Sequence, residues 1–392
     1  MADDGEPVEG HGTIDRLRIH EVTGLPPPRF GCGGEPVLCD PFLMSTCDHS
    51  RLLLRETLRE LLPPGSRCGL VLYPDHWNAG DAAIWCGTRQ VLRELGVEVA
   101  YGCDTTSYDK RALTHALPEG PILIAGGGNF GDVYVPEHAL RLRVLEDHPG
   151  RPVIQLPQSI WFRGAEGMAA TAEALRRHGH ATLLLRDAPS LEFAQRHFSC
   201  PARLCPDAAL ALDLSAVPRQ PDVPMVAVWR DDRESADPPP PMPPGSIACD
   251  WLLPGGVLPP EQARQMSIAG LAFHRWVGRP KLGEPCPVRR RLAWRHQPWL
   301  WDQLALDRCL RGCHMLSRGR VTITNRLHAH LMCLLMGQPH VACDVANGKV
   351  FTYRDTWGCD APFVRFAGSP AEAVEHAREL LATLPPQDGS PS

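Results

Sequence analysis

The sequence predicts an α/β protein with two doubly wound domains that face a cleft. Short apolar segments alternate with helical patterns along most of the chain, which is typical of βαβ units around a parallel sheet. A length of 392 residues favours two domains over one. Prolines at 218, 221 and 224 mark the linker between them. In such domains ligands bind where the strands end, so chemistry is expected there.

The first domain is predicted over residues 51–217, after an irregular arm at 1–50 that is rich in Gly and Pro and shows little periodicity. Apolar residues at helical spacing predict helices over 50–62 and 81–95. Short buried runs predict the strands, with further helices between the later ones. These strands cover 68–73, 97–101, 121–125, 153–156, 182–185 and 203–205.

The second domain is predicted over residues 225–384 by the same two patterns. A Pro-rich stretch at 238–244 is expected to be an exposed loop, residues 279–298 to be irregular, and 385–392 to form a disordered tail. The expected strands cover 225–229, 246–249, 321–324, 340–343 and 363–366, and the expected helices cover 260–276, 300–315, 326–336 and 370–384.

The composition is that of an ordinary globular chain, with 43% apolar and 22% charged residues. The net charge of -5 and the pI near 6.4 give no sign of nucleic-acid binding. No apolar run is long enough to span a membrane, and the acidic N-terminus does not resemble a signal peptide. The 15 cysteines are scattered without a C-x-x-C pair, so we expect a cytoplasmic protein without structural disulfides or a metal site.

The segment 321–330 carries the clearest chemical signal. A β-branched run stops at Asn325, which is expected to cap a helix that begins with Arg326. A helix N-terminus offers free backbone N–H groups and a positive dipole end, to which Arg326 and His328 add a guanidinium and an imidazole. This combination predicts a site for phosphate or carboxylate with a proton donor beside it. His330 lies about 200° round the helix from His328, so we expect it to be structural.

Two strand ends of the first domain carry further candidates. Asn78, Gly80 and Asp81 link a strand to a helix, where they could contact sugar hydroxyls or serve as turn and cap. Residues 126–132 contain G-x-G-x-x-G after a strand. The next strand carries Gln158 where a dinucleotide site needs an acid, so we discount NAD.

What remains of the glycine motif is a loop whose backbone approaches a ligand closely. Gly127 and Gly128 would offer N–H groups there, and Asn129 a side-chain contact. Arginines end two other strands. Arg186 is placed to bind an anion or to pair with Asp187, and Arg230 is expected to point into the cleft ahead of a solvated charge cluster at 232–234.

Taken in order, these motifs resemble the polysaccharide pyruvyl transferase family over roughly residues 71–357. Each motif alone is common, whereas their order and number make the match specific. The landmarks are N-A-G-D at 78–81, G-G-G-N-F-G-D at 126–132, Q-L-P-Q-S at 155–159, R-D at 186–187, P-D at 206–207, R-D-D-x-E at 230–234, D-W at 250–251, R-L-H-A-H at 326–330 and G-x-P-H at 337–340.

The resemblance implies two Rossmann-like domains in a GT-B arrangement. It also implies transfer of the enolpyruvyl carbons of phosphoenolpyruvate to a sugar, usually as a cyclic ketal. The family's R-L-H motif carries phosphoenolpyruvate binding over to Arg326, Leu327 and His328. Arg230 carries over from a similar arginine segment, and two arginines suit a ligand with a phosphate and a carboxylate.

On this reading His328 is the acid/base, and Arg326 and Arg230 stabilise the departing phosphate. The first domain faces the acceptor, a sugar or glycan precursor, through Asn78, Asp81, Asn129 and Gln158. No metal or cofactor is expected, because phosphoenolpyruvate itself is the donor. The sequence does not give the acceptor's identity, and it leaves homo-oligomer formation open.

Two other functions stay open at this point. A GT-B glycosyltransferase could hold the diphosphate of a nucleotide-sugar at the same helix N-terminus. A non-catalytic sugar-phosphate-binding protein would need the same ligand contacts without turnover.

Overall fold

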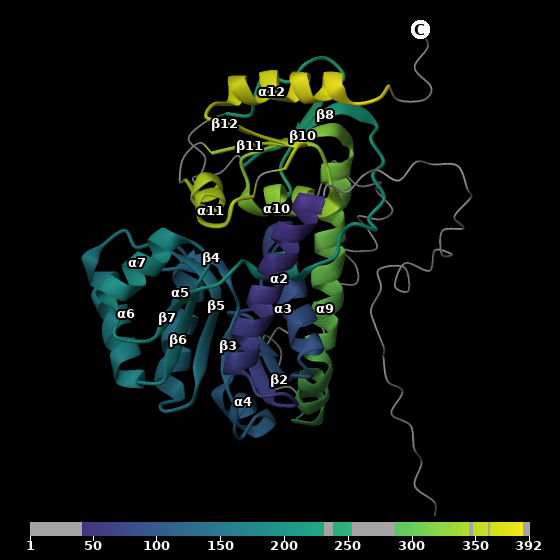
Figure 1. Ribbon diagram of the computed structural model, residues 1–392. Helices are drawn as coiled ribbons and strands as arrows, with labels where there is room; N and C mark the ends of the chain where they lie inside the picture. The colour runs from purple at the N-terminus through teal and green to yellow at the C-terminus, as the bar shows by residue number, and fades with distance from the viewer. Residues whose placement is uncertain (1–40, 231–237, 253–286, 345–347, 360, 387–392) are drawn as a thin grey trace, which may run out of the picture. The chain divides into compact units, whose positions relative to one another are not determined.

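Two parallel sheets form the framework of the protein (Figure 1). The computed structural model describes residues 41–230, 238–252, 287–344, 348–359 and 361–386. Within them a seven-stranded and a five-stranded sheet are interleaved with helices, and the strand pairs are parallel. The predicted α/β class with Rossmann-like sheets is therefore confirmed. Both sheets belong to one compact unit, Cys39–Ser392, and the domain boundaries at 217 and 225 stay a prediction.

The first sheet has the strand order β2-β1-β3-β5-β6-β7, with β4 paired to β5. The chain leaves β1 toward β2 on one side and then adds β3 on the other, so the order reverses between β1 and β3. Open α/β sheets bind ligands beyond the carboxyl ends of the strands at such a switch point. The strands are β1 Arg67–Val71, β2 Glu98–Cys103, β3 Ile122–Ile124, β4 Gly127–Phe130, β5 Val153–Ile160, β6 Ala181–Leu185 and β7 Ala202–Leu204.

Helices cover this sheet, and the N-terminus of α3 lines the pocket that is described below. It begins after Asn78, whose Oδ1 accepts a hydrogen bond from the Gly80 N–H at 3.0 Å, so Asn78 is the N-cap and Asp81 lies in the first turn. The helices are α2 Pro41–Leu61, α3 Ala79–Glu94, α4 Lys110–Ala116, α5 Val135–Asp147, α6 Ala165–His178 and α7 Ala188–His197, followed by the 3-10 helix η1 Ala208–Ala211.

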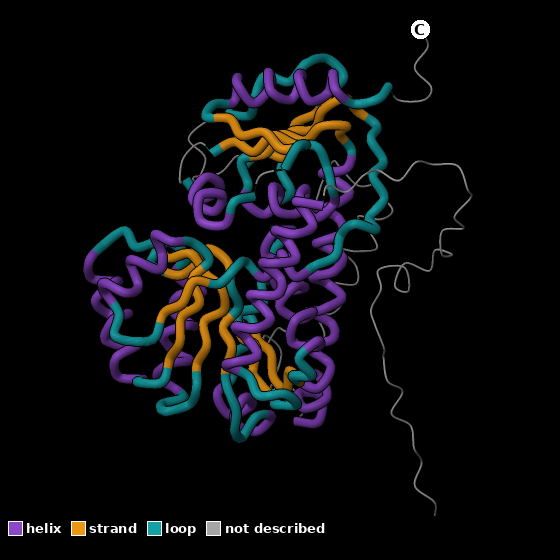
Figure 2. Tube along the Cα trace, viewed as in Figure 1, coloured by secondary structure: helices purple, strands orange, loops and turns teal. Residues whose placement is uncertain are grey.

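The second sheet has the order β12-β11-β10-β8-β9, so its switch point lies between β8 and β10. Figure 2 shows its strands between α12 on one face and α10 with α11 on the other. The strands are β8 Val223–Val228, β9 Ile247–Cys249, β10 Gly319–Thr324, β11 His340–Cys343 and β12 Val364–Ala367, and the helices are α9 Pro287–Ser317, α10 Leu327–Met336, α11 Lys349–Trp357 and α12 Pro370–Thr383.

The helix α9 contacts elements of both sheets, including α3, β2, β8 and β10. The rings of Tyr73 and Trp301 stack with centroids 4.8 Å apart, and Trp85 meets both edge-on. Asp302 accepts hydrogen bonds from the Trp85 indole at 2.9 Å and from Arg89 at 2.8 Å. Because α3 also contacts α10, its N-terminus is fixed next to the first turn of that helix.

Several elements differ from the sequence-based expectation. The helix α2 begins at Pro41, so the predicted irregular arm is helical from there. The helix α9 begins at Pro287 and runs through Pro298, since a proline removes one helical hydrogen bond without having to end the helix. The predicted glycine loop contains the strand β4, and α11 had no predicted counterpart. The helix expected over 260–276 and the charge cluster at 232–234 lie outside the described residues.

Among the helices described, none has the length and hydropathy that a membrane crossing requires.

Candidate active site

The main pocket, about 240 Å³ in volume, lies at the switch point of the second sheet. Arg230 follows β8 and Asn325 follows β10, the two strands between which the order reverses. Residues that follow strands of the first sheet complete the wall, so the pocket joins both sheets. It is lined by His76, Asn78, Asp81, Gly128, Asn129, Tyr134, Glu137, Arg186, Arg230, Trp251, Leu252, Asn325, Arg326, Leu327, His328, Asp344 and Lys349.

One wall of this pocket is cationic and carries two helix N-termini. The helix α10 begins at Leu327 and α11 begins at Lys349, and both residues line the pocket. The arginines at 186, 230 and 326 line it as well. Free N–H groups at helix N-termini together with guanidinium and ammonium groups favour an anion. This wall is therefore suited to a ligand that carries phosphate or carboxylate groups.

The cap of α10 differs from the predicted one. Arg326 is the N-cap residue and makes no side-chain cap hydrogen bond. Asn325 instead accepts a hydrogen bond from the backbone N–H of Arg230 at 2.7 Å, which ties the ends of β8 and β10 together. The expectation that Asn325 caps the helix was wrong, because its side chain is used across the switch point.

Arg326 is held in place by a carboxylate. Its Nη2 lies 2.6 and 2.8 Å from the two carboxylate oxygens of Asp250, and its guanidinium lies 5.6 Å from the centre of the Trp251 ring. The Arg326 side chain is 3% exposed, so this ion pair is largely shielded from water. Asp250 directly follows β9, so the end of this strand fixes the orientation of the Arg326 guanidinium.

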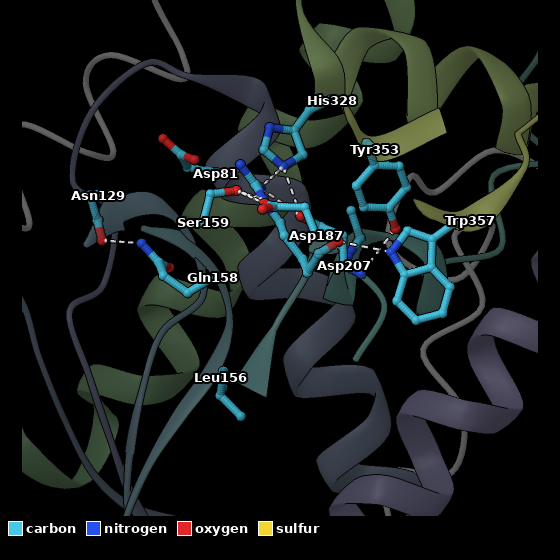
Figure 3. Close-up of polar contacts among 12 residues, drawn as sticks. Asp81, Asn129, Leu156, Gln158, Ser159, Asp187, Asp207, His328, Tyr353 and Trp357 are labelled. Carbon is cyan, nitrogen blue, oxygen red and sulfur yellow. Dashed lines mark hydrogen bonds and ion pairs between the residues drawn. The ribbon is translucent and has the colours of Figure 1, made fainter. Parts of the chain in front are cut away.

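His328 forms a buried cluster with Asp207 and Arg186 (Figure 3). Its Nε2 lies 3.2 Å from Oδ2 of Asp207, and the same oxygen accepts a hydrogen bond from Nη1 of Arg186 at 2.8 Å. Arg186 can only donate and Asp207 accepts, so the His328 contact with Asp207 is satisfied when Nε2 carries the proton. Burial by itself raises the pKa of Asp207, but His328, Arg186 and the Ala209 N–H together hold it below its usual range.

The packing of the His328 ring is set by a glycine. A Cβ on Gly80 would lie 2.5 Å from the Cβ of His328 and 2.7 Å from its Nδ1. Only glycine allows the N-terminus of α3 to approach the ring this closely. With the proton on Nε2, His328 donates to Asp207, whereas Nη1 of Arg186, 3.2 Å from Nε2, is a second donor and makes no hydrogen bond with it. His328 lines the pocket, and its Nδ1 makes no hydrogen bond among the described residues.

Residues of α11 and β5 brace this cluster. The Trp357 indole donates to the Arg186 carbonyl at 2.8 Å, and the Tyr353 hydroxyl accepts from the Asp207 N–H at 3.1 Å (Figure 3). Ser159 accepts from Nε of Arg186 at 2.8 Å and donates in turn to Asp187. Of the two roles expected for Arg186, pairing with Asp187 is not observed, since the guanidinium contacts Asp207 and Asp187 caps α7.

Another part of the lining belongs to the first half of the chain and carries polar groups, including the carboxylates of Asp81 and Glu137. Asn78 donates through Nδ2 to Oδ2 of Asp81 at 2.8 Å, so this N-cap residue also orients the carboxylate. Asn129 accepts at Oδ1 from Nε2 of Gln158 at 2.9 Å (Figure 3). Gln158 is fully buried behind Asn129 and does not line the pocket.

Comparison with known proteins agrees with this geometry. The sequence profile of the family "Polysaccharide pyruvyl transferase" matches residues 78–241. Pyruvyl transferase 1 of Schizosaccharomyces pombe is 28% identical over 333 residues, which cover 80% of this chain and 75% of that protein. The putative pyruvyl transferase EpsO of Bacillus subtilis is 27% identical over 329 residues, covering 81% and 94%.

The chain is thus similar to the polysaccharide pyruvyl transferase family, a family of transferases, over residues 78–241, and to proteins named as pyruvyl transferases over about four fifths of its length. A crystal structure of a functionally uncharacterised protein from Klebsiella pneumoniae aligns with a TM-score of 0.50 at 15% identity, covering 82% of this chain and 99% of that one. That likeness concerns the fold alone.

The structure brings most of the predicted site residues into one pocket. Those that line it are Asn78, Asp81, Gly128, Asn129, Arg186, Arg230, Asn325, Arg326, Leu327 and His328. Three other predicted site residues lie behind those that line the pocket. Gly80 packs on His328, Gly127 pairs with Gln158 between β4 and β5, and Gln158 holds Asn129. His330 is fully buried against His340 at 2.7 Å, which confirms its structural role.

Sequence reasoning missed several residues in and around this pocket, among them Asp207, Asp250 and Lys349. Asp207 and Asp250 each follow a strand, and both lie in motifs shared with the family, P-D and D-W. An acid at a strand end was the signal that could have assigned them a role. Lys349 had no such signal, because neither α11 nor its N-terminus was predicted.

Proposed function

We propose that this protein transfers the pyruvyl group of phosphoenolpyruvate to hydroxyl groups of a sugar in a glycan or glycan precursor, forming a ketal. The observation that carries the proposal is the cationic wall with His328 at its edge, built from two helix N-termini and four cationic side chains at 186, 230, 326 and 349. Phosphoenolpyruvate needs both anion contacts and a proton, and this wall offers both. The cytoplasmic location expected from the cysteine pattern would suit that donor.

The donor is bound by charge. Arg326 and Arg230 come from the two strands of one switch point, and Lys349 approaches from α11. Two anionic groups a few bonds apart, the carboxylate and the phosphate, can each meet a cation on this wall. Asp250 neutralises part of the Arg326 charge and fixes its orientation, so donor binding uses geometry as well as net charge.

His328 supplies the proton for the first step. Protonation of the donor's methylene carbon C3 by the imidazolium gives oxocarbenium character at C2, and a sugar hydroxyl attacks there. The attacking hydroxyl gives its proton to the His328 ring as the C–O bond forms, which restores the protonated imidazole. Asp207 balances the charge that the His328 ring carries before the transfer and holds the ring in position.

A second hydroxyl of the same sugar then attacks C2, the bond to the phosphate oxygen breaks, and the proton of that hydroxyl passes to the departing phosphate. The products are the cyclic ketal and inorganic phosphate. The departing phosphate is stabilised by the arginines and the helix N-termini that bound it in the donor. The wall with Asn78, Asp81 and Asn129 faces the acceptor.

The test is a phosphate-release assay with phosphoenolpyruvate and a panel of sugar acceptors, followed by mass analysis of the acceptor for the added pyruvyl group. We expect release only when phosphoenolpyruvate and an acceptor are both present. The His328→Ala variant should bind phosphoenolpyruvate, keep its fold and lose turnover. His180→Ala is the control, because His180 is exposed and precedes β6, at the opposite end of the sheet from the site.

Two results would replace this proposal. Binding of a nucleotide-sugar without binding of phosphoenolpyruvate would identify a glycosyltransferase. Binding of phosphoenolpyruvate and sugar without any turnover by the wild-type protein would identify a sensor with a degenerate site.

A further inference from the structure

A second, smaller pocket of about 90 Å³ lies at the switch point of the first sheet. We call it the side pocket. Leu72, Tyr73 and Pro74, which follow β1, and Ala125 and Gly126, which follow β3, line it. It occupies the place where a doubly wound sheet binds its ligand, just as the main pocket does in the second sheet.

The two pockets share part of their walls. His76, Asp81, Asn129 and Glu137 line both of them. A molecule in the side pocket therefore meets the donor pocket across these four residues. We propose that the side pocket binds the uncharged sugar ring that carries the accepting hydroxyls, and that Arg141 fixes Asn129 as a hydrogen-bond donor toward it. This inference rests on the proposed function.

Charge separates the two pockets. Among the described residues, those that line the side pocket include the acids Asp75, Asp81 and Glu137 but no arginine or lysine. Arg308 neutralises Asp75 at 3.0 Å from outside the lining. Carboxylates accept hydrogen bonds from hydroxyl groups and repel anions. Together with the aromatic walls of Tyr73 and Trp85, this chemistry fits a neutral sugar and disfavours an acidic one.

Arg141 determines which end of the Asn129 amide faces the pockets. Its Nη2 lies 2.9 Å from one terminal atom of Asn129, and an arginine can only donate, so that atom is Oδ1. Gln158 contacts the same oxygen at 2.9 Å and must donate as well. With Oδ1 held from behind by two donors, the Nδ2 group of Asn129 is the end left to donate to an acceptor hydroxyl.

The surroundings of Arg141 support a positioning role. It is 2% exposed and forms no ion pair among the described residues; its partners are Oε1 of Gln155 at 2.7 Å, His138 at 3.4 Å and two oxygens of Asn129. A buried guanidinium without a carboxylate costs folding free energy. Burial also lowers the pKa of Arg141 to about 9, with the charge of Glu137 opposing the shift.

The first experiment measures acceptor and donor constants for Asn129→Asp. The new side chain keeps an oxygen for Arg141 and gains an ion pair with it, so the folded state should not lose stability. The donor group toward the sugar disappears. We expect the KM for the acceptor to rise about tenfold, and by a larger factor than the Kd for phosphoenolpyruvate. An unchanged acceptor KM, or an equal loss of donor affinity, overturns the inference.

Arg141→Lys keeps the positive charge but loses the planar guanidinium group, which donates hydrogen bonds to Gln155 and Asn129 at once. It should raise the acceptor KM without changing donor affinity. Arg143→Lys is the matched control, because Arg143 lies on the same helix with its side chain 61% exposed.

The second experiment needs no turnover. Binding of methyl glucoside, mannoside, galactoside and glucuronide is measured by saturation-transfer NMR with phosphoenolpyruvate present. Thr105→Phe fills the side pocket from an exposed position that does not line the main pocket, and Thr114→Phe is its exposed control on α4. We expect neutral glycosides to bind, the glucuronide to bind at least tenfold more weakly, and Thr105→Phe to abolish binding. Binding that survives in Thr105→Phe, or a preference for the glucuronide, overturns the inference. Sugar binding without phosphate release would count against the proposed function alone.

Discussion

The Nε2 atom of His328 lies 3.2 Å from Oδ2 of Asp207, although the two residues are 121 positions apart in the chain. Asp207 caps η1 beyond β7 of the first sheet, and His328 belongs to α10 of the second. The contact therefore joins the two sheets at the point where chemistry is proposed. Because Asp207 is fully buried and also pairs with Arg186, it can hold the imidazole in one orientation.

Asp207→Asn should impair both turnover and stability. The amide cannot balance the charge on the His328 ring, so kcat should fall about a hundredfold or more. Arg186 is left buried without its carboxylate, which should cost about 3–5 kcal/mol in the free energy of unfolding. Steady-state kinetics and urea unfolding measure the two effects. Full activity in a folded Asp207→Asn protein would remove the pair from the mechanism.

The pH dependence of this loss has a definite sign. The pKa of Asp207 in the folded protein is below its ordinary value, so the carboxylate contributes stability at neutral pH. That contribution declines only in acid, as the pH falls below about 4. The stability difference between wild type and Asp207→Asn should therefore be constant near pH 7 and shrink at the acid end.

Gly80→Ala should displace the His328 ring. The added Cβ would lie 2.5 Å from a carbon of that ring's side chain, and something must shift. Overpacking of this kind costs about 1–3 kcal/mol, and a shift of the acid/base by about 1 Å can lower kcat about a hundredfold. Gly164→Ala is the control, since a Cβ there meets no atom within 4 Å. Equal kinetics for the two variants would contradict the proposed geometry.

Local patterns predicted much of the fold. The strand expected over 340–343 is β11, and most other strands begin or end within two residues of the expected position. The first turn of α10 was also placed correctly to within one residue. Apolar runs and turn residues are local signals, so a single sequence contains them.

What the sequence could not show depends on residues far apart in the chain. The partner of Arg186 is 21 positions away and the partner of Arg326 is 76 away, so no spacing rule selects Asp207 or Asp250. The sequence predicts Asn325 as a helix cap, but its side chain instead accepts from the backbone N–H of Arg230, which lies 95 positions earlier. The extension of α9 through Pro298 was missed because, in a single sequence, a proline predicts the end of a helix.

The buried pair His330 and His340 should make the protein sensitive to acid. Burial lowers the pKa of His330 well below its usual value and that of His340 to about 4, with His340 also disfavouring a charge on His330. The unfolded chain binds protons on both rings as the pH falls below about 6.5, whereas the folded protein does not. Stability should therefore decrease between about pH 6.5 and 4, by about 1.4 kcal/mol per pH unit for each proton.

Urea unfolding at pH 7 and pH 5 checks this effect in the wild type and in His330→Gln/His340→Gln. The double variant should lose the part of the slope that these two rings contribute, about 1.4 kcal/mol per pH unit for each proton. His138 and His148, whose pKa values burial lowers to about 4, stay in both proteins and contribute equally. Parallel stability curves for the two proteins would show that the pair does not titrate in this range.

Lys349→Met should weaken binding of the proposed donor without moving His328. Lys349 is the first residue of α11 and lines the main pocket, where a Cβ on Gly128 would lie 3.8 Å from its Nζ. Removing one cation from the anion site should raise the Kd for phosphoenolpyruvate about tenfold and make binding less sensitive to salt. Lys110→Met is the matched control, because Lys110 is exposed on α4 and pairs with Asp147. Calorimetric titration at low and high ionic strength separates the two variants. Identical affinities would show that Lys349 does not contact the donor, and the anion contacts would then rest on the arginines and the helix N-termini alone.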